Sequence, residues 1–458
     1  MKKELKDFIN SHSKVALNRR DLLKYGLIGF STYAVAPRFV WGKSIITPTQ
    51  KPIPFLVFDL AGGAALSGNF LVGKKGGPQD LLSSYQTLGW NPRQTKLDET
   101  YGIPMAGDGV SKILTGLNSV IEESARKKLK FSTICNFSRD DTGSNPLSAL
   151  ALVMGTIQSD AVAIASMLGI ENSTSGGRSS LATGGSSGKP VFMGSADSLT
   201  KGTGVFGRYP NYSRDVRTQI VDYAKNIGEK LADPSLKNRR AFFERVKNSY
   251  TEMTKELLLS RQMDGRLNSE CRAVYQLEET TDPTSRDARI GTLVYNVLAG
   301  NTGPGVVSIG GCDYHNGTQN TGDQKDQEIG VEVGKAVELA RRLKTPLFIQ
   351  IITDGGIYSQ KGSRVWQGDS GNRSLTVMGY YDPAQSIDYA DNSGQIGAYT
   401  DGEGVDTSSL VGDSPFIAAK TVLANYLVAS KREQDLEKYL GRVLFDKRDQ
   451  MIAYRWGG

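Results

Sequence analysis

Histidine is almost absent from this sequence of 458 residues. Only two histidines occur, and His12 lies in the N-terminal segment, which leaves His315 as the single imidazole of the remaining chain. A zinc site built from several histidines is therefore excluded. A Ser-His-Asp hydrolase is also disfavoured, because His315 would have to act as its base away from any Gly-x-Ser-x-Gly turn.

Cysteine and long apolar runs are scarce as well. The three cysteines, Cys135, Cys271 and Cys312, are too few and too far apart for a disulfide framework or a Cys-x-x-Cys metal site. Cys135 lies within a strand-like run, so we expect a buried structural thiol there. No apolar run after the N-terminal segment reaches the roughly 20 residues that a membrane-spanning helix needs. The body of the chain is therefore expected to be soluble, with no spanning segment.

Excess positive charge is confined to the N-terminus. Residues 1–43 contain nine Lys or Arg and three Asp or Glu, so six of the seven net positive charges lie there. The rest of the chain is close to neutral. Nucleic acid is not an expected partner, because the basic isoelectric point comes from the N-terminal segment and not from a basic surface.

The N-terminal segment resembles a twin-arginine export signal. Arg19 and Arg20 are followed by one spacer, an apolar pair and Lys24, and then by an uncharged run at 25–36. The alternative, a membrane anchor, is disfavoured because this run is too short to span a bilayer. Residues 1–45 are therefore predicted to be a signal that the Tat translocase recognises, which places the protein in the periplasm. Cleavage and retention of the signal both stay open, because Ala-Val-Ala at 34–36 suits a cleavage site but Pro37 does not.

Between residues 50 and 458, short apolar runs alternate with longer amphipathic ones. This pattern predicts an α/β domain with a mostly parallel, doubly wound sheet. Strands are expected at 54–60, 130–137, 305–310 and 346–353, and helices at 110–129, 324–342 and 416–430. Long charged helical patterns indicate a helical insertion at about 213–283.

Several polar residues directly follow apolar runs, where open α/β sheets form their binding sites. They are Asp59, Asp313, His315 and Asp354, together with Asp369 in a predicted loop at 367–372. Each acid could instead be a helix cap or a turn residue, and the histidine a hydrogen-bonded loop residue. If these groups converge at one sheet edge, a cation must neutralise them, which predicts a divalent metal. An oxygen-dominated donor set favours Mg, Ca or Mn over a two-zinc site.

One stretch carries a family resemblance. The block Gly-Gly-Cys-Asp-Tyr-His at 310–315, with the predicted helix and strand that follow it, is similar to the Gly-Gly-x-Asp-x-His block of the domain of unknown function 1501 family. That family consists largely of exported bacterial proteins and is placed in the alkaline phosphatase and sulfatase superfamily. The resemblance covers about the last third of the chain and implies an alkaline phosphatase-like fold.

The resemblance also implies roles for the candidate residues. Asp313 and His315 take metal-ligand positions, Asp354 matches the acid that closes the next strand, and Asp59 is placed like the first metal-binding Asp of the superfamily. The chain departs from the family at Asp369, which serine follows where histidine is frequent, and at 64–65, where alanines replace a polar residue. A full two-zinc phosphatase site is therefore not expected.

Enzymes of the superfamily use a Ser, Thr or Cys nucleophile at a helix N-terminus, where free amides stabilise an anion. Thr142 and Ser144 precede an apolar helical run and are the candidates here. The alternative, which we favour, is a plain helix cap, in which Ser144 or Asn145 caps a helix whose first residue is Pro146.

The function expected from these residues is hydrolysis of a phosphate or sulfate ester by an exported metal-binding protein. The alternative is a non-catalytic binding or assembly protein of the cell envelope, which the missing second histidine favours. The expected partner is accordingly a small-molecule ester or an envelope component. No nucleotide cofactor is expected, since neither a Walker lysine nor dinucleotide glycine spacing follows Gly62 and Gly63.

Overall fold

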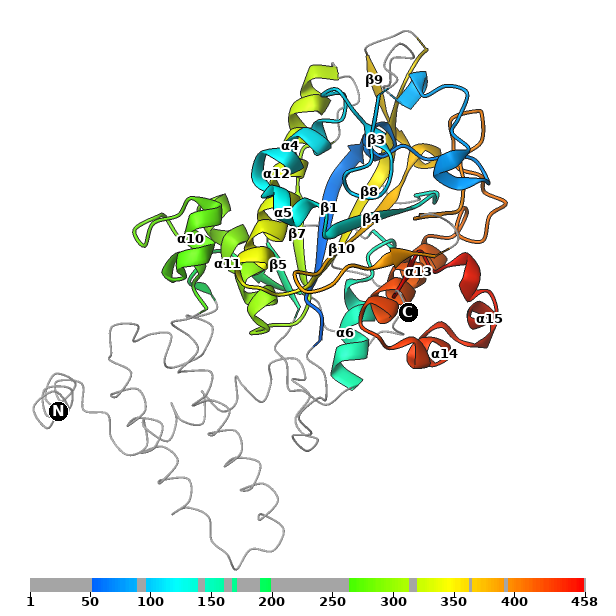
Figure 1. Ribbon diagram of the computed structural model, residues 1–458. Coiled ribbons are helices and arrows are strands. Elements are labelled where there is room, and N and C mark those ends of the chain that lie inside the picture. The colour runs from blue at the N-terminus through cyan, green and yellow to red at the C-terminus, as the bar shows by residue number, and fades with distance from the viewer. Residues whose placement is uncertain are drawn as a thin grey trace, which may run out of the picture. The chain divides into compact units, whose positions relative to one another are not determined.

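A nine-stranded, mostly parallel sheet forms the centre of the fold (Figure 1). The computed structural model describes residues 52–88, 96–138, 145–159, 167–170, 190–198, 263–312, 319–361, 365–390 and 394–456, with the backbone alone at 158, 159, 191, 368 and 369. All of these residues belong to one compact unit of the chain.

The strand order is β12-β4-β10-β8-β1-β7-β5-β6, and β9 pairs with β8 outside this row. The strands span Phe55–Ala64 (β1), Leu129–Ile134 (β4), Leu168–Ile170 (β5), Val191–Met193 (β6), Gly305–Ile309 (β7), Leu347–Ser359 (β8), Trp366–Ser370 (β9), Thr376–Tyr381 (β10) and Gln395–Ile396 (β12). β1 pairs in parallel with β7 and β8, while β10 lies antiparallel between β8 and β4. Parallel strands are covered on both faces, which explains why β1, β7 and β8 are rich in apolar residues.

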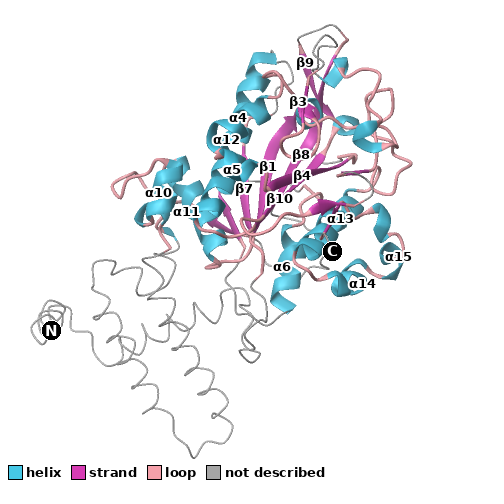
Figure 2. Cartoon of the chain, viewed as in Figure 1, coloured by secondary structure: helices cyan, strands magenta, loops and turns pink. Residues whose placement is uncertain are grey.

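Helices cover both faces of the sheet (Figure 2). α4 (Lys112–Val120), α11 (Arg286–Ala299) and α12 (Gln319–Arg342) lie on one face, and α6 (Leu150–Ser159) and α13 (Pro415–Ala429) lie on the other. The shorter helices are α3 (Leu66–Asn69), α5 (Glu123–Arg126), α10 (Ser269–Tyr275), α14 (Leu436–Leu440) and α15 (Arg442–Phe445). Two small sheets pair β2 (Leu97–Asp98) with β3 (Met105–Ala106) and β11 (Asp388–Tyr389) with β13 (Tyr454–Arg455). Single 3-10 turns occur at Gly77–Gln79, Gln86–Leu88, Gly265–Leu267, Gly371–Arg373, Glu433–Asp435 and Arg448–Gln450.

α12 packs closely against α4 because glycines lie where the two helices meet. A Cβ atom on Gly330 would lie 2.2 Å from the carbonyl oxygen of Ile113, and one on Gly116 would lie 2.4 Å from that of Gln327. Any side chain at these positions would force the helices apart.

α13 covers the opposite face with apolar side chains. Ser414 caps the helix by accepting a hydrogen bond from the Ile417 N–H, and proline follows at the first helical position. Beneath the helix, the ring centroid of Phe348 lies 5.8 Å from those of Phe55 and Tyr426. This aromatic cluster forms the centre of the core on the α13 face.

The four predicted strands are present as β1, β4, β7 and β8, and the helices predicted at 324–342 and 416–430 are present as α12 and α13. The single helix predicted at 110–129 is wrong. The backbone is extended at Ile121 and Glu122, and the Arg126 side chain donates hydrogen bonds to the carbonyls of Asn118 and Ile121. These bonds satisfy the end of α4, so that α5 can begin as a separate helix.

The export signal predicted at 1–45 lies outside the described residues, as does most of the insertion predicted at about 213–283. Cys135, Cys271 and Cys312 are all free and buried, which confirms the structural thiol expected at Cys135. Among the helices that the structure describes, none is long and apolar enough to cross a bilayer.

Candidate functional site

A β-bulge interrupts the pairing of β1 with β8 at the carboxyl edge of the sheet. The register shifts between Leu60 and Gly63, so that Ala61 and Gly62 together lie opposite Asp354. Gly62 has a φ of 99°, which glycine adopts without a steric penalty. A bulge of this kind bends its strand and redirects the neighbouring side chains.

Asp59 and Asp354 lie on these two adjacent strands. The prediction that they end their strands is wrong, because β1 continues to Ala64 and β8 to Ser359. Asp59 is fully buried and pairs with Ile352 in register. Since side chains alternate along a strand, Asp59 and Asp354 belong to the face of Ile352, which packs in the core on the α13 face.

The pair Thr353–Asp354 joins β8 to the bulge. The Gly62 N–H donates to Oδ2 of Asp354 at 3.2 Å. The Thr353 hydroxyl accepts from the Ala64 N–H at 2.8 Å and lies 2.9 Å from the Gly62 carbonyl and 2.8 Å from the Gly355 carbonyl, to either of which it can donate. The end of β1 is thus held by the side chains of β8 where the regular ladder is interrupted.

Two further side chains bind the backbone of this pair. Ser138, after β4, donates from its hydroxyl to the Asp354 carbonyl at 2.6 Å, and the Asn145 side-chain amide donates to the Thr353 carbonyl at 3.0 Å. Ser138 and Asn145 are the last and first described residues on either side of 139–144. The candidate nucleophiles Thr142 and Ser144 lie in that interval, outside the described residues.

The cap interpretation for this region is wrong, because α6 begins at Leu150 and not at Pro146. The Asn145 side chain accepts from the Leu147 N–H at 3.0 Å and so closes a turn. Gln350, fully buried on β8, then donates to the Leu147 carbonyl at 2.6 Å and accepts from the Ala149 N–H at 2.9 Å. Sequence reasoning missed Gln350, although one amide inside the apolar run of β8 was the signal that could have identified it.

The loop after β7 is attached to the same bulge. The Cys312 N–H donates to the Ala61 carbonyl at 3.1 Å. Burial, and next the charge of Asp326, raise the pKa of the Cys312 thiol, as is typical of a buried structural cysteine. Asp313 and His315 follow directly in sequence and lie outside the described residues.

A buried polar network lies nearby, between α3, α4 and α12. The Asn69 side-chain amide donates to Oδ2 of Asp326 at 2.7 Å, while its oxygen accepts from the Ser111 hydroxyl at 2.8 Å and the Ile113 N–H at 3.2 Å. This network fixes the start of α4 against α12. No pattern in the sequence predicted it.

The loop predicted at 367–372 is wrong, because Asp369 lies within the strand β9. β8 runs far enough beyond the sheet edge to pair with β9 antiparallel, and this pairing satisfies the backbone of a polar segment that has little apolar character of its own. The Asp369 side chain lies outside the description.

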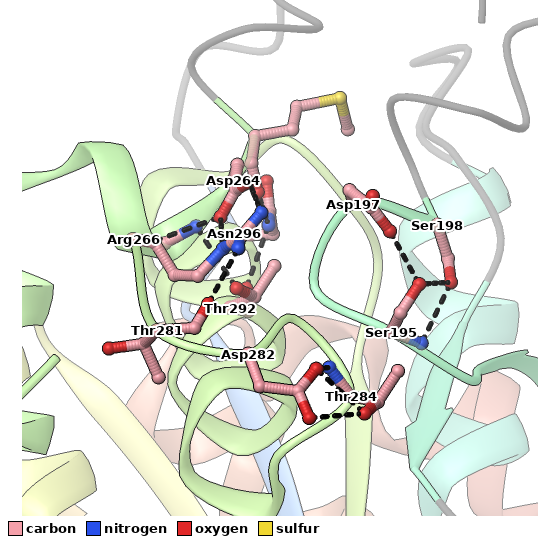
Figure 3. Close-up of polar contacts among 12 residues, drawn as sticks. Ser195, Asp197, Ser198, Asp264, Arg266, Thr281, Asp282, Thr284, Thr292 and Asn296 are labelled. Carbon is pink, nitrogen blue, oxygen red and sulfur yellow. Dashed lines mark hydrogen bonds and ion pairs between the residues drawn. The ribbon is translucent and has the colours of Figure 1, made fainter. Parts of the chain in front are cut away.

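A second cluster of polar contacts lies around Asp264 (Figure 3). Arg266 donates to both carboxylate oxygens of Asp264, at 3.1 and 2.7 Å, and to the Thr281 carbonyl at 2.8 Å. The groups satisfy one another, so the cluster is structural.

Within the described part of the chain, no three His, Cys, Asp or Glu side chains are grouped as metal ligands. Among the described side chains of β1 and β8, Asp59 and Asp354 are the two carboxylates near the bulge. Their oxygen donors fit a hard divalent cation better than a soft one. No protein-family model, curated protein or solved structure gives a significant match to this chain.

Proposed function

We propose that this chain is an exported periplasmic protein of the alkaline phosphatase and sulfatase superfamily. It binds one divalent metal ion through Asp59, Asp313, His315 and Asp354, and it hydrolyses a phosphate or sulfate ester. Mg, Ca or Mn suits the oxygen-rich donor set. Arg19 and Arg20 direct its export, so replacing both with lysine should leave the protein in the cytoplasm, and unchanged periplasmic recovery would contradict export.

The observation that supports this site best is the bulge at Ala61 and Gly62. Gly62 donates to the Asp354 carboxylate, and Ala61 accepts from Cys312, the residue directly before Asp313. Two of the four proposed ligands are therefore tied by backbone hydrogen bonds, directly or through one neighbour in sequence, to adjacent residues of β1. The same strand carries Asp59, a third.

The candidate nucleophiles lie between two residues, Ser138 and Asn145, that both bind the backbone of β8 near the bulge. Ser138 and Asn145 bind the carbonyls of Asp354 and Thr353, and only six residues separate them in sequence. A bound divalent ion would supply polarisation of the ester oxygens. The hydroxyl of Thr142 or Ser144 would lose its proton and attack the phosphorus or sulfur atom of the ester, which expels the alcohol, and water would then hydrolyse the ester formed on the enzyme. The carboxylates Asp59 and Asp354 would hold the ion.

Metal titration of the purified full-length chain tests the proposal. Manganese added to metal-free protein should bind with a stoichiometry of about one, as read by calorimetry and elemental analysis. His315→Ala and Asp354→Asn should each abolish binding, together with any hydrolysis of p-nitrophenyl phosphate or p-nitrophenyl sulfate. Asp449→Asn is the matched control, because that side chain is 91 % exposed and far in sequence from the proposed ligands.

The outcomes separate the alternatives. Two tightly bound ions per chain, or full hydrolytic activity in His315→Ala, would restore an ordinary two-metal phosphatase. One bound ion without hydrolysis of either ester would favour the non-catalytic binding or assembly protein of the cell envelope. Absence of manganese binding in the unmodified chain would contradict the proposed metal site.

A further inference from the structure

The Thr353 hydroxyl contacts β1 on the far side of the interruption in its pairing with β8. β1 and β8 pair regularly up to Leu60 and Thr353, and pairing resumes at Gly63. Just beyond the interruption, the Ala64 N–H donates to the Thr353 side chain at 2.8 Å. Thr353 is fully buried, so no solvent can replace its hydroxyl.

The same hydroxyl controls the position of Gly62. Its oxygen lies 2.9 Å from the Gly62 carbonyl, and the N–H of Gly62 is the donor to Asp354. Gly62 has a positive φ and no side chain, and the peptide that carries its N–H is also held by the Cys312 N–H, which donates to the Ala61 carbonyl. Thr353 therefore restrains the carbonyl side of the residue whose N–H binds Asp354, although Thr353 is not itself a candidate ligand.

We infer that Thr353 is a positioning residue, whose hydroxyl holds the bulge at Ala61 and Gly62 so that the Gly62 N–H orients the Asp354 carboxylate. This inference rests on the proposed function for its effect on metal binding. Groups that orient a metal ligand typically change metal affinity by about 10- to 100-fold when they are removed. Thr353 should act on affinity in this way while the overall fold persists.

The test compares three substitutions in the full-length chain. Thr353→Val keeps the shape of the side chain and removes the hydroxyl, whereas Thr353→Ser keeps the hydroxyl and removes a methyl group. Thr421→Val is the matched control, because Thr421 is a fully buried threonine of α13 whose hydroxyl has no hydrogen-bond partner among the described residues. Circular dichroism and thermal unfolding establish that each variant is folded.

Manganese affinity is the first readout. Thr353→Val should weaken binding by at least about 10-fold, while Thr353→Ser and Thr421→Val should stay within about 3-fold of the unmodified chain. A folded Thr353→Val protein with unchanged affinity would overturn the inference. If Thr353→Val does not fold, loss of affinity in a folded Thr353→Ser protein would overturn it equally.

Hydrogen exchange of the backbone amides at 60–66, measured by mass spectrometry, is the second readout and needs no metal. Thr353→Val should accelerate exchange there, and Thr421→Val should not. Faster exchange with no manganese binding in any protein would support the role of Thr353 and reject the metal site. Unchanged exchange in folded Thr353→Val would overturn the inference whether or not the metal binds.

Discussion

α13 covers one face of the sheet with rings and aliphatic side chains, whereas α12, on the other face, buries glycines and charged groups in addition to its aliphatic side chains. On the α13 face, Phe348 contacts the rings of Phe55 and Tyr426. On the α12 face, Gly330 admits the backbone of α4, and Glu332 is buried beside charged neighbours.

The difference shows that the two faces of one sheet can be stabilised in different ways. Apolar packing contributes in proportion to the area it buries, and it accepts substitutions that conserve volume. The stability of the α12 face depends also on a few close contacts between helix backbones and on ion pairs of buried carboxylates. No other residue can replace a glycine or a buried charge in such a contact without cost. We therefore expect the α13 face to respond to loss of volume and the α12 face to added volume and to pH.

Phe348→Ala should have the largest effect on stability. Removing a ring that lies 5.8 Å from two neighbouring rings leaves a cavity on the α13 face, at a cost of about 3–5 kcal/mol in the free energy of unfolding. Chemical denaturation measures this loss. Phe416→Ala, at a phenylalanine that is 41 % exposed, should stay within about 0.5 kcal/mol, and an equal loss in both variants would contradict the core role of Phe348.

Gly330→Ala should destabilise the protein by adding one methyl group. Its Cβ would lie 2.2 Å from the Ile113 carbonyl oxygen, so α4 must move away from α12, which costs about 1–3 kcal/mol. Gly155→Ala in α6 is the matched control, because no atom of the described residues lies within 4 Å of the Cβ that alanine would add there. There, alanine should stabilise the protein by about 0.5–1 kcal/mol, since glycine is unfavourable inside a helix. If the denaturation midpoints of the two variants shift in the same direction and by the same amount, the claim that Gly330 is required for close packing of α4 on α12 is contradicted.

The smallest expected effect concerns two glutamates of α12. Burial raises the pKa of Glu332, and Lys335 and Arg286 only partly offset this. The pKa of Glu338 is lowered, because hydrogen bonds from Arg341 and Arg342 outweigh its burial. The two carboxyls should therefore give stability opposite dependences on pH.

The signs follow from proton binding by the native chain. Glu332 binds its proton more tightly in the native state, so its contribution is complete below the unfolded value of 4.5 and is lost as pH rises through the native pKa. Glu338 contributes above 4.5, and this is lost as pH falls through its native pKa. Melting temperatures of Glu332→Gln and Glu338→Gln, each subtracted from those of the unmodified chain, should slope oppositely with pH. Parallel slopes would contradict this assignment.

The sequence predicted the central strands because parallel strands need apolar residues on both faces. It failed where tertiary pairing overrode local composition. Gly62 and Asp369 are typical of loops, yet both lie in strands because β8 provides a partner beyond the sheet edge. The end of α4 at Val120 could not be predicted from the residues around it. The side chain that hydrogen-bonds the carbonyls at this end of the helix is Arg126, six residues later.

The candidate site was predictable only in part, for a physical reason. Asp59 and Asp354 follow apolar runs, so their places on adjacent strands could be expected from the sequence. The side chains that hold the edge together could not, because Ser138, Asn145 and Thr353 bind backbone groups that are remote in sequence or opposite a bulge. Such partners carry no local pattern.

The pairing of β1 also determines how long this strand lacks its partners during translation. Leu56 pairs with Gly305 and with Ile349, about 250 and 290 positions later. At about 5–20 residues per second, a ribosome takes roughly 12–60 s to deliver those partners after Leu56 has been made. During that interval an apolar strand with two open edges is exposed to pairing with other chains. One of the two central strands of the finished sheet is thus the one that a cell must shield for longest, so β1 is the segment where we expect a nascent-chain chaperone to bind.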